Sequence, residues 1–564
     1  MLLVSAPELQ ILGKTISELS GGSPLIASIL GHSLKTVDVA ARDQLLHELD
    51  YYLTTSQISK GETQVLEISY QRLSHELKQC LLYMGQFPEG QDIQVDKLCM
   101  LLAAEDLLLP VDSGRRKTTL MKSVRNTLEK LAMKRLVDVQ EDNVSMTRMY
   151  KSCRLHDQIR ELCISKGLDE EFFKIVDFKS EKELGPSTRR LAIYLSKYGD
   201  GDAIRFRSHD TRKKIRSLLI FDAYDSHKKS TWPSEINDLK EFGKLRALDF
   251  DGVDFRARKL PRGMDKLVLL RYLSFRGCCL ENFPPSISKF PCLETLDLRV
   301  KDCNLAIPDV LSTMKRLRHL YFPIMYRSDS SNKLKLLGLD RLEILVNFDT
   351  GACNVDDIFH LENLQVLAAI SDGNPKDLEA IIKCLDKKSA DLHHSSLNIR
   401  NFDCYTKERV AIFTKVLECK SLHSLHIEGP IGHLPKNVAI SRNFTEMVFD
   451  GSELEDDTMI VLGKLENLRS LILSNNAYVG YEMAFAASTF PNLRVLKLLN
   501  LEYMENLTFE KGALPKLSTL VIDKCGELQK VSMPKELHDM LQRAKESNGD
   551  DVYLVEPFPT IRTN

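Results

Sequence analysis

Leucines recur at a regular interval through the second half of the chain. The pattern L-x-x-L-x-L begins every 22 to 25 residues in two blocks, with its first positions at Leu245, Leu270, Leu293, Leu317, Leu342 and Leu364, then at Leu422, Phe444, Leu468, Leu493 and Leu517. A degenerate copy, HSSLNI, lies between the blocks, and two weaker copies, TRRLAI and IRSLLI, lie upstream. Because apolar residues alternate within each copy, every copy predicts one short β-strand with one buried face.

This interval is typical of leucine-rich repeats, whose units span about 20 to 29 residues. A single unit cannot bury its leucines alone. We therefore expect the units to stack into a curved solenoid, with a parallel sheet on the concave face and helices or irregular segments on the convex face.

The strand residues that alternate with the leucines should face outward on the concave surface. An extended concavity without a deep pocket suits a macromolecular partner better than a metabolite. The residues at these positions are mixed in charge and include aromatic side chains. We predict that the partner-binding residues are Asp249, Tyr272, Arg276, Asp297, Arg299, His319, Tyr321, His426, Glu428 and Lys497.

The middle of the array departs from the pattern. Asn347 and Ala369 occupy positions where a leucine would fill the core better, and His394 replaces an apolar residue in the degenerate copy. A long insert covers about residues 370 to 393. We expect the solenoid to bend or loosen in this region, because small or polar side chains fill a core poorly.

The first 176 residues predict helices. In PELQILGKTISELSGG the apolar residues fall on one helical face and two glycines end the segment. Ser23 then fits an N-cap, with Pro24 at the first helical position of the next helix. Further helices are expected over AARDQLLHELDYYL, ETQVLEISYQRL, ELKQCLLYM and DKLCMLLAAEDLL.

A winged helix is predicted at the end of this part. The stretch 118–135 carries four apolar residues at helical spacing, and two β-like runs follow it, at 136–139 and 144–149, around the turn signal Glu-Asp-Asn. Another helix should begin near His156. The predicted fold class is therefore α/β, with an N-terminal helical and winged-helix part followed by a leucine-rich-repeat solenoid of about 12 to 14 units.

Composition excludes several classes of protein. The chain has 564 residues and a formal net charge of -2, so it lacks the positive field that a non-specific nucleic-acid binder needs. Its 13 cysteines contain no C-x-x-C pair, which argues against a zinc ribbon and favours reduced thiols. No apolar run reaches the roughly 18 residues of a membrane span, and the N-terminus has no basic segment typical of a secretory signal.

Three fragments look like nucleotide-binding motifs but fail on spacing. Gly13-Lys14-Thr15 lacks the earlier P-loop glycine, because that position is Glu8, and the basic loop at 114–118 fails in the same way. The run DLLLPVD contains Pro110, which would interrupt a buried strand. The sequence also contains no G-x-S-x-G and no H-E-x-x-H. We therefore predict that the chain is not an enzyme and does not hydrolyse ATP.

Four segments in a fixed order resemble the plant NB-ARC leucine-rich-repeat disease resistance proteins of the coiled-coil type. GSPLIA at 22–27 is similar to the GLPLA motif, and LKQCLLYMGQFPEG at 77–90 is similar to CFLYCSLFPED. LCMLLAAEDLL resembles LIRLWIAEGFI, and RLHDQIRELCISK from Arg154 resembles the MHD motif with Leu155 in place of methionine. The resemblance covers essentially the whole chain.

The resemblance implies roles for two residues. In that family the GLPLA proline packs near the adenine of ADP and the MHD histidine reaches the β-phosphate, so these roles would fall on Pro24 and His156. The family's coiled coil, P-loop and kinase-2 strand would precede Met1, which implies a truncated chain without most of the nucleotide pocket. We therefore expect no bound cofactor in this chain, although the full-length family binds ADP and ATP.

The function that the resemblance implies is that of a plant immune receptor-like protein. Its repeats would recognise a pathogen effector or a guarded host protein, and its helical part would dock on the repeats. A second hypothesis is a regulatory or decoy fragment that acts on full-length receptors. We expect the protein in the cytoplasm, with the nucleus as a second compartment.

Two other classes fit the sequence less well. A winged-helix DNA-binding regulator needs a free basic recognition helix, whereas the apolar face of 118–135 is suited to a core. A repeat-based adaptor of a ubiquitin ligase would need an F-box-like N-terminus. The domain boundaries we predict are 1–75 for the helical part, 76–176 for the winged helix, 177–535 for the repeats and 536–564 for a tail.

Overall fold

A computed structural model gives the fold of the chain. It describes residues 13–14, 16–17, 20, 22–36, 61–107, 120–141, 150–177, 183–185, 187–195, 204–206, 209–222, 232–256, 259–435, 438–455, 458–548 and 561–563. The chain divides into two compact units, which we describe separately. The N-terminal unit holds residues 1–142 and 148–279, and the C-terminal unit holds residues 143–147 and 280–564.

The N-terminal unit begins with helices. Helix α2 (Pro24–Thr36) starts with proline at its first position, as predicted, and the Ser23 hydroxyl accepts a long 3.5 Å hydrogen bond from the Ile26 amide. Helix α4 (Gly61–Gln71) packs on α2 and on α8. The predicted helix at residues 40–53 lies outside the described residues, and so does most of the predicted first helix.

A winged-helix module follows, which we define as residues 75–169. It contains α5 (His75–Met84), α6 (Val95–Ala104), α7 (Leu120–Met133) and α8 (Asp157–Asp169), with an antiparallel sheet in the order β1 (Ile93–Gln94), β3 (Tyr150–Arg154), β2 (Asp138–Glu141). Val124, Leu128 and Leu131 of α7 are fully buried, as their spacing predicted. Strand β2 begins two residues later than predicted, and β1 was not predicted. The predicted strand at 144–149 lies outside the described residues.

Parallel strands complete the N-terminal unit. They are β4 (Lys174–Val176), β6 (Arg190–Tyr194), β8 (Ser217–Phe221), β9 (Ala247–Asp251) and β10 (Tyr272–Ser274), in that order across the sheet. Both weak repeat copies therefore form strands, β6 and β8. Strand β4 carries no copy of the pattern and was not predicted. Short elements flank the strands, namely β5 (Glu183–Leu184), β7 (Arg205–Phe206), α9 (His209–Lys214), η2 (Ser234–Ile236) and η3 (Met264–Lys266).

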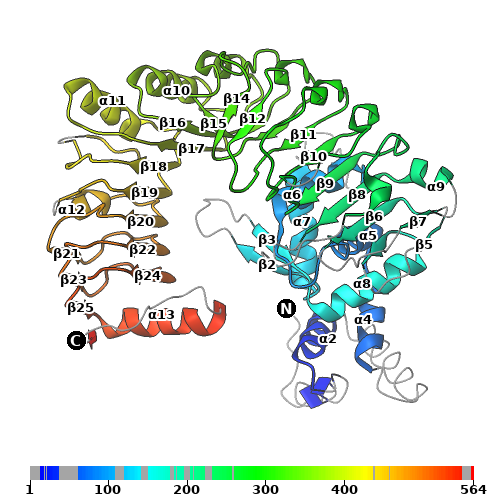
Figure 1. Cartoon of the computed structure of the whole chain (residues 1–564). Coiled ribbons are helices and arrows are strands. Elements are labelled where there is room, and N and C mark those ends of the chain that lie inside the picture. Colours follow the sequence, from blue (N-terminus) through cyan, green and yellow to red (C-terminus); the bar gives the residue numbers. More distant parts are fainter. Residues whose placement is uncertain are drawn as a thin grey trace. The chain divides into compact units, whose positions relative to one another are not determined.

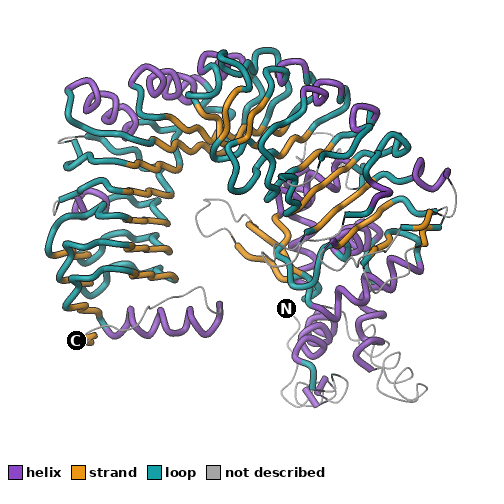
Figure 2. Tube along the Cα trace, viewed as in Figure 1, coloured by secondary structure: helices purple, strands orange, loops and turns teal. Residues whose placement is uncertain are grey.

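The C-terminal unit is a stack of parallel strands. In order they are β11 (Thr295–Asp297), β13 (His319–Tyr321), β15 (Ile344–Asp349), β16 (Val366–Ser371), β17 (His394–Ile399), β18 (Ser424–Glu428), β19 (Glu446–Asp450), β20 (Ser470–Ser474), β22 (Val495–Leu499) and β24 (Thr519–Asp523). Within this unit the strands lie along one side and helices and loops along the other (Figures 1 and 2). This layering is the predicted leucine-rich-repeat solenoid.

The other side of the C-terminal unit varies from repeat to repeat. It carries η4 (Pro285–Lys289), η5 (Leu311–Thr313), η6 (Val355–His360), α10 (Pro375–Lys387), α11 (Lys407–Glu418) and α12 (Thr458–Leu462), and two small sheets, β12 (Leu305–Ile307) with β14 (Tyr326–Ser328) and β21 (Glu482–Phe485) with β23 (Asn506–Phe509), β25 (Lys530–Met533) and β26 (Ile561–Thr563). Helix α13 (Lys535–Asn548) packs against β24. The predicted insert at 370–393 therefore contains a full helix, α10.

The core of the solenoid consists of the repeated leucines. Leu296, Leu345 and Leu471 are fully buried, and burial of each such side chain contributes about 1.5–3 kcal/mol to folding. The predicted irregularity is present at Asn347, which has a positive φ of 58° and marks a register shift between β15 and β16. Its side-chain amide donates to the Phe322 carbonyl oxygen at 2.9 Å, so a polar contact replaces the missing leucine.

Candidate recognition surface

Each repeat strand has one face toward the leucine core and one face away from it. We call the second face the strand face. In the N-terminal unit the strand face is covered by the winged-helix module, because α6 packs on β10 and side chains of α5 and α6 contact β6, β8 and β9 (Figure 1). In the C-terminal unit the strand face from β16 to β24 is partly exposed. The two faces therefore differ in what they can bind.

A buried lysine holds the centre of the covered face. Lys97 Nζ of α6 lies 2.6 Å from Asp249 Oδ2 and 2.7 Å from Asp251 Oδ2, and the side chains of Lys97 and Asp249 are 4% and 0% exposed. Burial alone would lower the pKa of Lys97, but the two carboxylates outweigh it and raise that pKa above its usual value. Gln91 Nε2 also donates to Asp251 at 3.3 Å. The lysine is therefore a protonated link between the module and β9.

A second buried ion pair links Glu105, the residue that follows α6, to β6. Arg190 Nε lies 2.6 Å from Glu105 Oε2, and both side chains are almost completely buried. Burial raises the pKa of Glu105, while Arg190 opposes that change. The Tyr83 hydroxyl of α5 lies 3.3 Å from the Ser217 hydroxyl of β8. Because one buried charge of such a pair is costly without the other, we infer that these contacts fix the position of α6 on the strands.

Aromatic packing fills the space beside these ion pairs. The ring centroids of Phe87 and Phe221 are 5.5 Å apart, and those of Tyr194 and Phe221 are 5.7 Å apart. The Tyr194 hydroxyl donates to the Gln86 carbonyl oxygen at 3.0 Å and accepts from Arg160 at 2.8 Å. The covered face is thus an internal interface with an apolar centre and paired charges.

Three predicted partner-binding residues lie in this internal interface. Asp249 and Tyr272 are 0% and 1% exposed, and Arg276 Nη1 lies 3.8 Å from Asp96 Oδ1 of α6. The structure therefore does not present Asp249 and Tyr272 on an open recognition surface. The sequence pattern gave the direction of these side chains correctly, but it does not show that the module packs on them.

Four more predicted residues form a packed group at the start of the C-terminal unit. Asp297, His319 and Tyr321 are buried, and Arg299 is partly exposed. The Arg299 guanidinium donates to Asp297 at 2.5 Å and lies 4.1 Å from the centre of the Tyr321 ring. His319 Nδ1 hydrogen-bonds to the Thr295 hydroxyl at 2.8 Å, and burial lowers the pKa of His319 to about 3. At neutral pH this histidine is therefore uncharged.

The remaining predicted residues lie on the partly exposed strand face. His426, Glu428 and Lys497 are half-buried or exposed. Burial lowers the pKa of His426, although Asp450 and Glu428 oppose that change. The parallel register aligns Ile472, Lys497 and Val521 across three adjacent strands, so one cation lies between two apolar side chains. These residues together offer apolar, acidic and basic groups to a partner.

The two residues with implied nucleotide roles are both exposed. Pro24 begins α2, and His156 is the N-cap of α8, where its Nδ1 accepts a hydrogen bond from the Gln158 amide at 3.4 Å. This is a capping role, since it satisfies one of the free amides at the helix start. Helices α2 and α8 both pack on α4. The nucleotide roles of the two residues stay a prediction.

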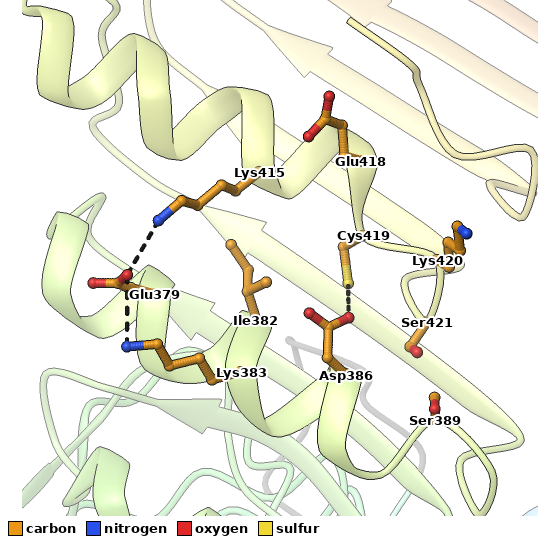
Figure 3. Close-up of a pocket in the computed structure, with 10 residues that line it drawn as sticks. All are labelled: Glu379, Ile382, Lys383, Asp386, Ser389, Lys415, Glu418, Cys419, Lys420 and Ser421. Atoms are coloured by element: carbon orange, nitrogen blue, oxygen red, sulfur yellow. Dashed lines mark hydrogen bonds and ion pairs between the residues drawn. The ribbon is translucent and has the colours of Figure 1, made fainter.

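A groove of about 470 Å³ lies between α10 and α11 of the C-terminal unit (Figure 3). Three of its charged residues pair with one another, because Glu379 lies 3.1 Å from Lys415 and 3.6 Å from Lys383. The Cys419 thiol contacts the Asp386 carboxylate at 3.8 Å. Burial raises the pKa of Cys419 to about 11, so the thiol is protonated at neutral pH and is a poor nucleophile. We assign no chemistry to this groove.

The module residues that cover the strand face do not follow from the repeat pattern. Lys97, Glu105 and Arg190 were not proposed as functional. One signal was available: Lys97 and Glu105 interrupt a segment that is otherwise strongly apolar, and a charge on a buried helix face usually has a partner.

In the described part of the chain, no helix is long and apolar enough to cross a membrane, and no group of three or more potential metal ligands is present.

The comparison with protein-family profiles agrees with the fold. The profile described as "Leucine-rich repeat region" matches residues 214–542. The chain belongs to the leucine-rich repeat family. A solved leucine-rich-repeat protein of Leptospira interrogans, LIC12759, is 15% identical, with a TM-score of 0.33, and the match covers 68% of this chain and 96% of that chain.

Sequence relatives of this repeat protein are plant disease resistance proteins. The probable disease resistance RPP8-like protein 2 of Arabidopsis thaliana is 29% identical over 584 residues, which cover 98% of this chain and 61% of the relative. The disease susceptibility protein LOV1 of Arabidopsis thaliana is 29% identical over 580 residues, with the same coverage. The resemblance to plant disease resistance proteins is therefore confirmed. The chain spans about three fifths of the length of these relatives.

Proposed function

We propose that this protein is a plant immune receptor-like protein that recognises a pathogen effector or a guarded host protein. The observation that carries the proposal is the similarity to disease resistance proteins along 98% of the chain, which includes both the winged-helix module and the repeats. The partly exposed strand face from β16 to β24 supports it, because a broad face with mixed polar and apolar side chains suits a protein partner.

The recognition surface in this proposal comprises His426, Glu428 and Lys497 with their apolar neighbours. A partner that binds there must desolvate Lys497, for which no described residue forms an ion pair or a side-chain hydrogen bond. A partner carboxylate beside Lys497, with apolar side chains on Ile472 and Val521, would satisfy both requirements. We therefore expect the energetically important contacts to lie in this row.

The covered strand face serves as the regulatory part in this proposal. The Lys97 and Glu105 ion pairs hold the module on the first repeats. A ligand or nucleotide can shift this arrangement only if it binds the docked and undocked arrangements with different affinity. The nucleotide roles of Pro24 and His156 belong to this part of the proposal. Retention of ADP by the purified chain, measured after denaturation, tests them; we expect none.

The site of action in the proposal is the cytoplasm. All 13 cysteines are free thiols, and nine of them are buried. A reducing compartment keeps such thiols unpaired. The partner is therefore expected to be a protein that is present inside the plant cell.

A binding experiment with matched variants tests the recognition surface. The full chain is screened against purified effector proteins and host proteins by surface plasmon resonance. A partner found in this way is then measured with Glu428→Ala/Lys497→Ala and with Glu379→Ala/Lys383→Ala, which removes the same two residue types from α10. We expect the first variant to weaken binding by about tenfold or more and the second to leave it unchanged. The reverse result would refute the proposal.

A further inference from the structure

Four arginines occupy the same repeat position on neighbouring strands of the N-terminal unit. They are Arg189, Arg216, Arg246 and Arg271, and each stands just before β6, β8, β9 or β10. The backbone links them directly, because the amides of Arg216, Arg246 and Arg271 each donate to the carbonyl oxygen of the preceding arginine at 2.7, 2.7 and 2.8 Å. Adjacent strands are about 4.8 Å apart, so the four residues form a row that we call the arginine row.

One half of the arginine row already binds a carboxylate. Asp106, which follows α6, lies 2.6 Å from Arg246 Nη1 through one oxygen and 2.5 Å from Arg271 Nη1 through the other. A single carboxylate therefore bridges two neighbouring arginines. The Asp106 side chain is 40% exposed, so this contact forms at the surface and not in the core.

The other half of the arginine row has no such carboxylate among the described residues. Arg189 is exposed and Arg216 is half-buried, and neither forms an ion pair with a described side chain. Glu105 attracts Arg216 electrostatically, but it is already bound to Arg190. Burial lowers the pKa of Arg216, and the positive charges of Arg246 and Arg189 lower it further. Lys214 and Lys244, both exposed, add positive charge two residues before Arg216 and Arg246.

We propose that Arg189 and Arg216 form a binding site for an acidic segment of a partner protein. The geometry of Asp106 on the next pair shows which group fits: one carboxylate whose two oxygens each accept from one guanidinium. The exposed lysines favour a segment with more than one Asp or Glu. This site is separate from the strand face, so it does not depend on the proposed recognition surface.

An anisotropy measurement with a fluorescein-labelled oligo-glutamate peptide tests this site. The full chain is titrated at low ionic strength, and we expect Arg189→Gln/Arg216→Gln to weaken binding by about tenfold, since two exposed charge pairs are lost. The matched control is Arg442→Gln, which removes an exposed arginine from the C-terminal unit and should leave binding unchanged. Added salt should weaken binding by the wild-type chain, because it screens exposed charges.

Several outcomes would overturn the proposal. Equal peptide binding by the wild-type chain and the double variant excludes the site. A chain that binds tripolyphosphate but does not bind the peptide also excludes it. If the double variant has a lowered melting temperature, Arg189→Gln alone is measured, because Arg189 is exposed and its side chain forms no hydrogen bond or ion pair with a described residue. That single variant should then weaken peptide binding by about threefold, and unchanged binding would refute the site.

Discussion

The strand face of the N-terminal unit and that of the C-terminal unit are built by the same repeat and have different surroundings. On β9 the outward position holds Asp249, which is fully buried and bound to Lys97. On β18 and β22 the outward positions hold His426 and Lys497, which are only half-buried. The repeat therefore determines which way a side chain points, whereas the element that packs on the strand determines whether it is available to a partner.

The two faces also differ in how their charges are balanced. The ion pairs of the covered face bring opposite charges within 4 Å of each other, as for Lys97 with Asp249 and Glu105 with Arg190. On the partly exposed face Lys497 has no such partner in the described part of the chain. It does not need one, because its side chain is accessible to solvent. A buried charge needs an opposite charge or hydrogen-bond partners nearby, whereas an exposed charge does not. Removing a charge should therefore have very different effects on the two faces.

The largest effect is expected at the centre of the covered face. Lys97→Met leaves the buried Asp249 and the partly exposed Asp251 without their cation, which should lower the free energy of unfolding by about 3–5 kcal/mol. Urea denaturation of the full chain, followed by the fluorescence of Trp232 in the N-terminal unit, measures this loss.

A compensated variant is the control for this prediction. Lys97→Met/Asp249→Asn/Asp251→Asn removes the charges together and should recover most of the lost stability, because no uncompensated charge stays buried. If Lys97→Met alone costs less than about 1 kcal/mol, the ion pairs do not hold the module on the strands.

The next effect concerns a buried histidine of the C-terminal unit. The pKa of His319 is lowered by burial to about 3, below its usual value of 6.5, so the folded state resists protonation. Its contribution to stability is complete above about pH 6.5 and is lost as the pH falls toward 3. At about pH 4.5 the loss should reach roughly 3 kcal/mol, and His319→Gln should remove this part of the pH dependence.

A second histidine provides the comparison. His433 is 58% exposed and pairs with Glu455, so His433→Gln should leave the acid dependence almost unchanged. The groups that face His319 are Arg318, which disfavours its protonation, and Glu343, 3.9 Å away. A wild-type chain and a His319→Gln variant with parallel stability curves from pH 7 to 4.5 would show that His319 does not titrate as described.

Most of the fold could be predicted from the sequence, because the leucines that form the core of the repeats recur at a regular interval. The repeated leucines predicted strands such as β11 and β20, and the poor core residue Asn347 correctly indicated an irregularity. The first strand of the module's wing, β2, was misplaced by two residues, because short β-runs with few apolar residues carry a weak signal. Strand β4 has no leucine pattern at all and was missed.

The recognition surface could be predicted only in part. The alternation of residues gave the outward direction of Asp249 and Tyr272 as well as of His426 and Glu428. Whether such a residue is covered depends on contacts between segments more than 150 residues apart, such as that of Lys97 with Asp251. A pattern within one repeat does not contain that information, whereas a lone charge in an apolar helix is a usable indication of it.

A smaller effect is expected from a neutral contact of the covered face. Tyr83→Phe removes the hydroxyl that contacts Ser217 and leaves the ring in place. The loss of one buried hydrogen bond should lower the free energy of unfolding by about 1 kcal/mol. Tyr405→Phe is the control, since Tyr405 is 79% exposed and should cost nothing measurable. Equal effects of the two variants would argue against a specific contact between α5 and β8.

The smallest effect is expected on the partly exposed face. Glu428→Ala/Lys497→Ala removes two charges that are not buried pairs, so the free energy of unfolding should change by less than about 0.5 kcal/mol. Urea denaturation measures this, alongside the binding assay with the same variant. A large loss of stability would mean that these side chains hold the solenoid together, as Lys97 does in the other unit. A stable variant that has lost its partner would instead show that the outward position serves recognition where nothing packs on it.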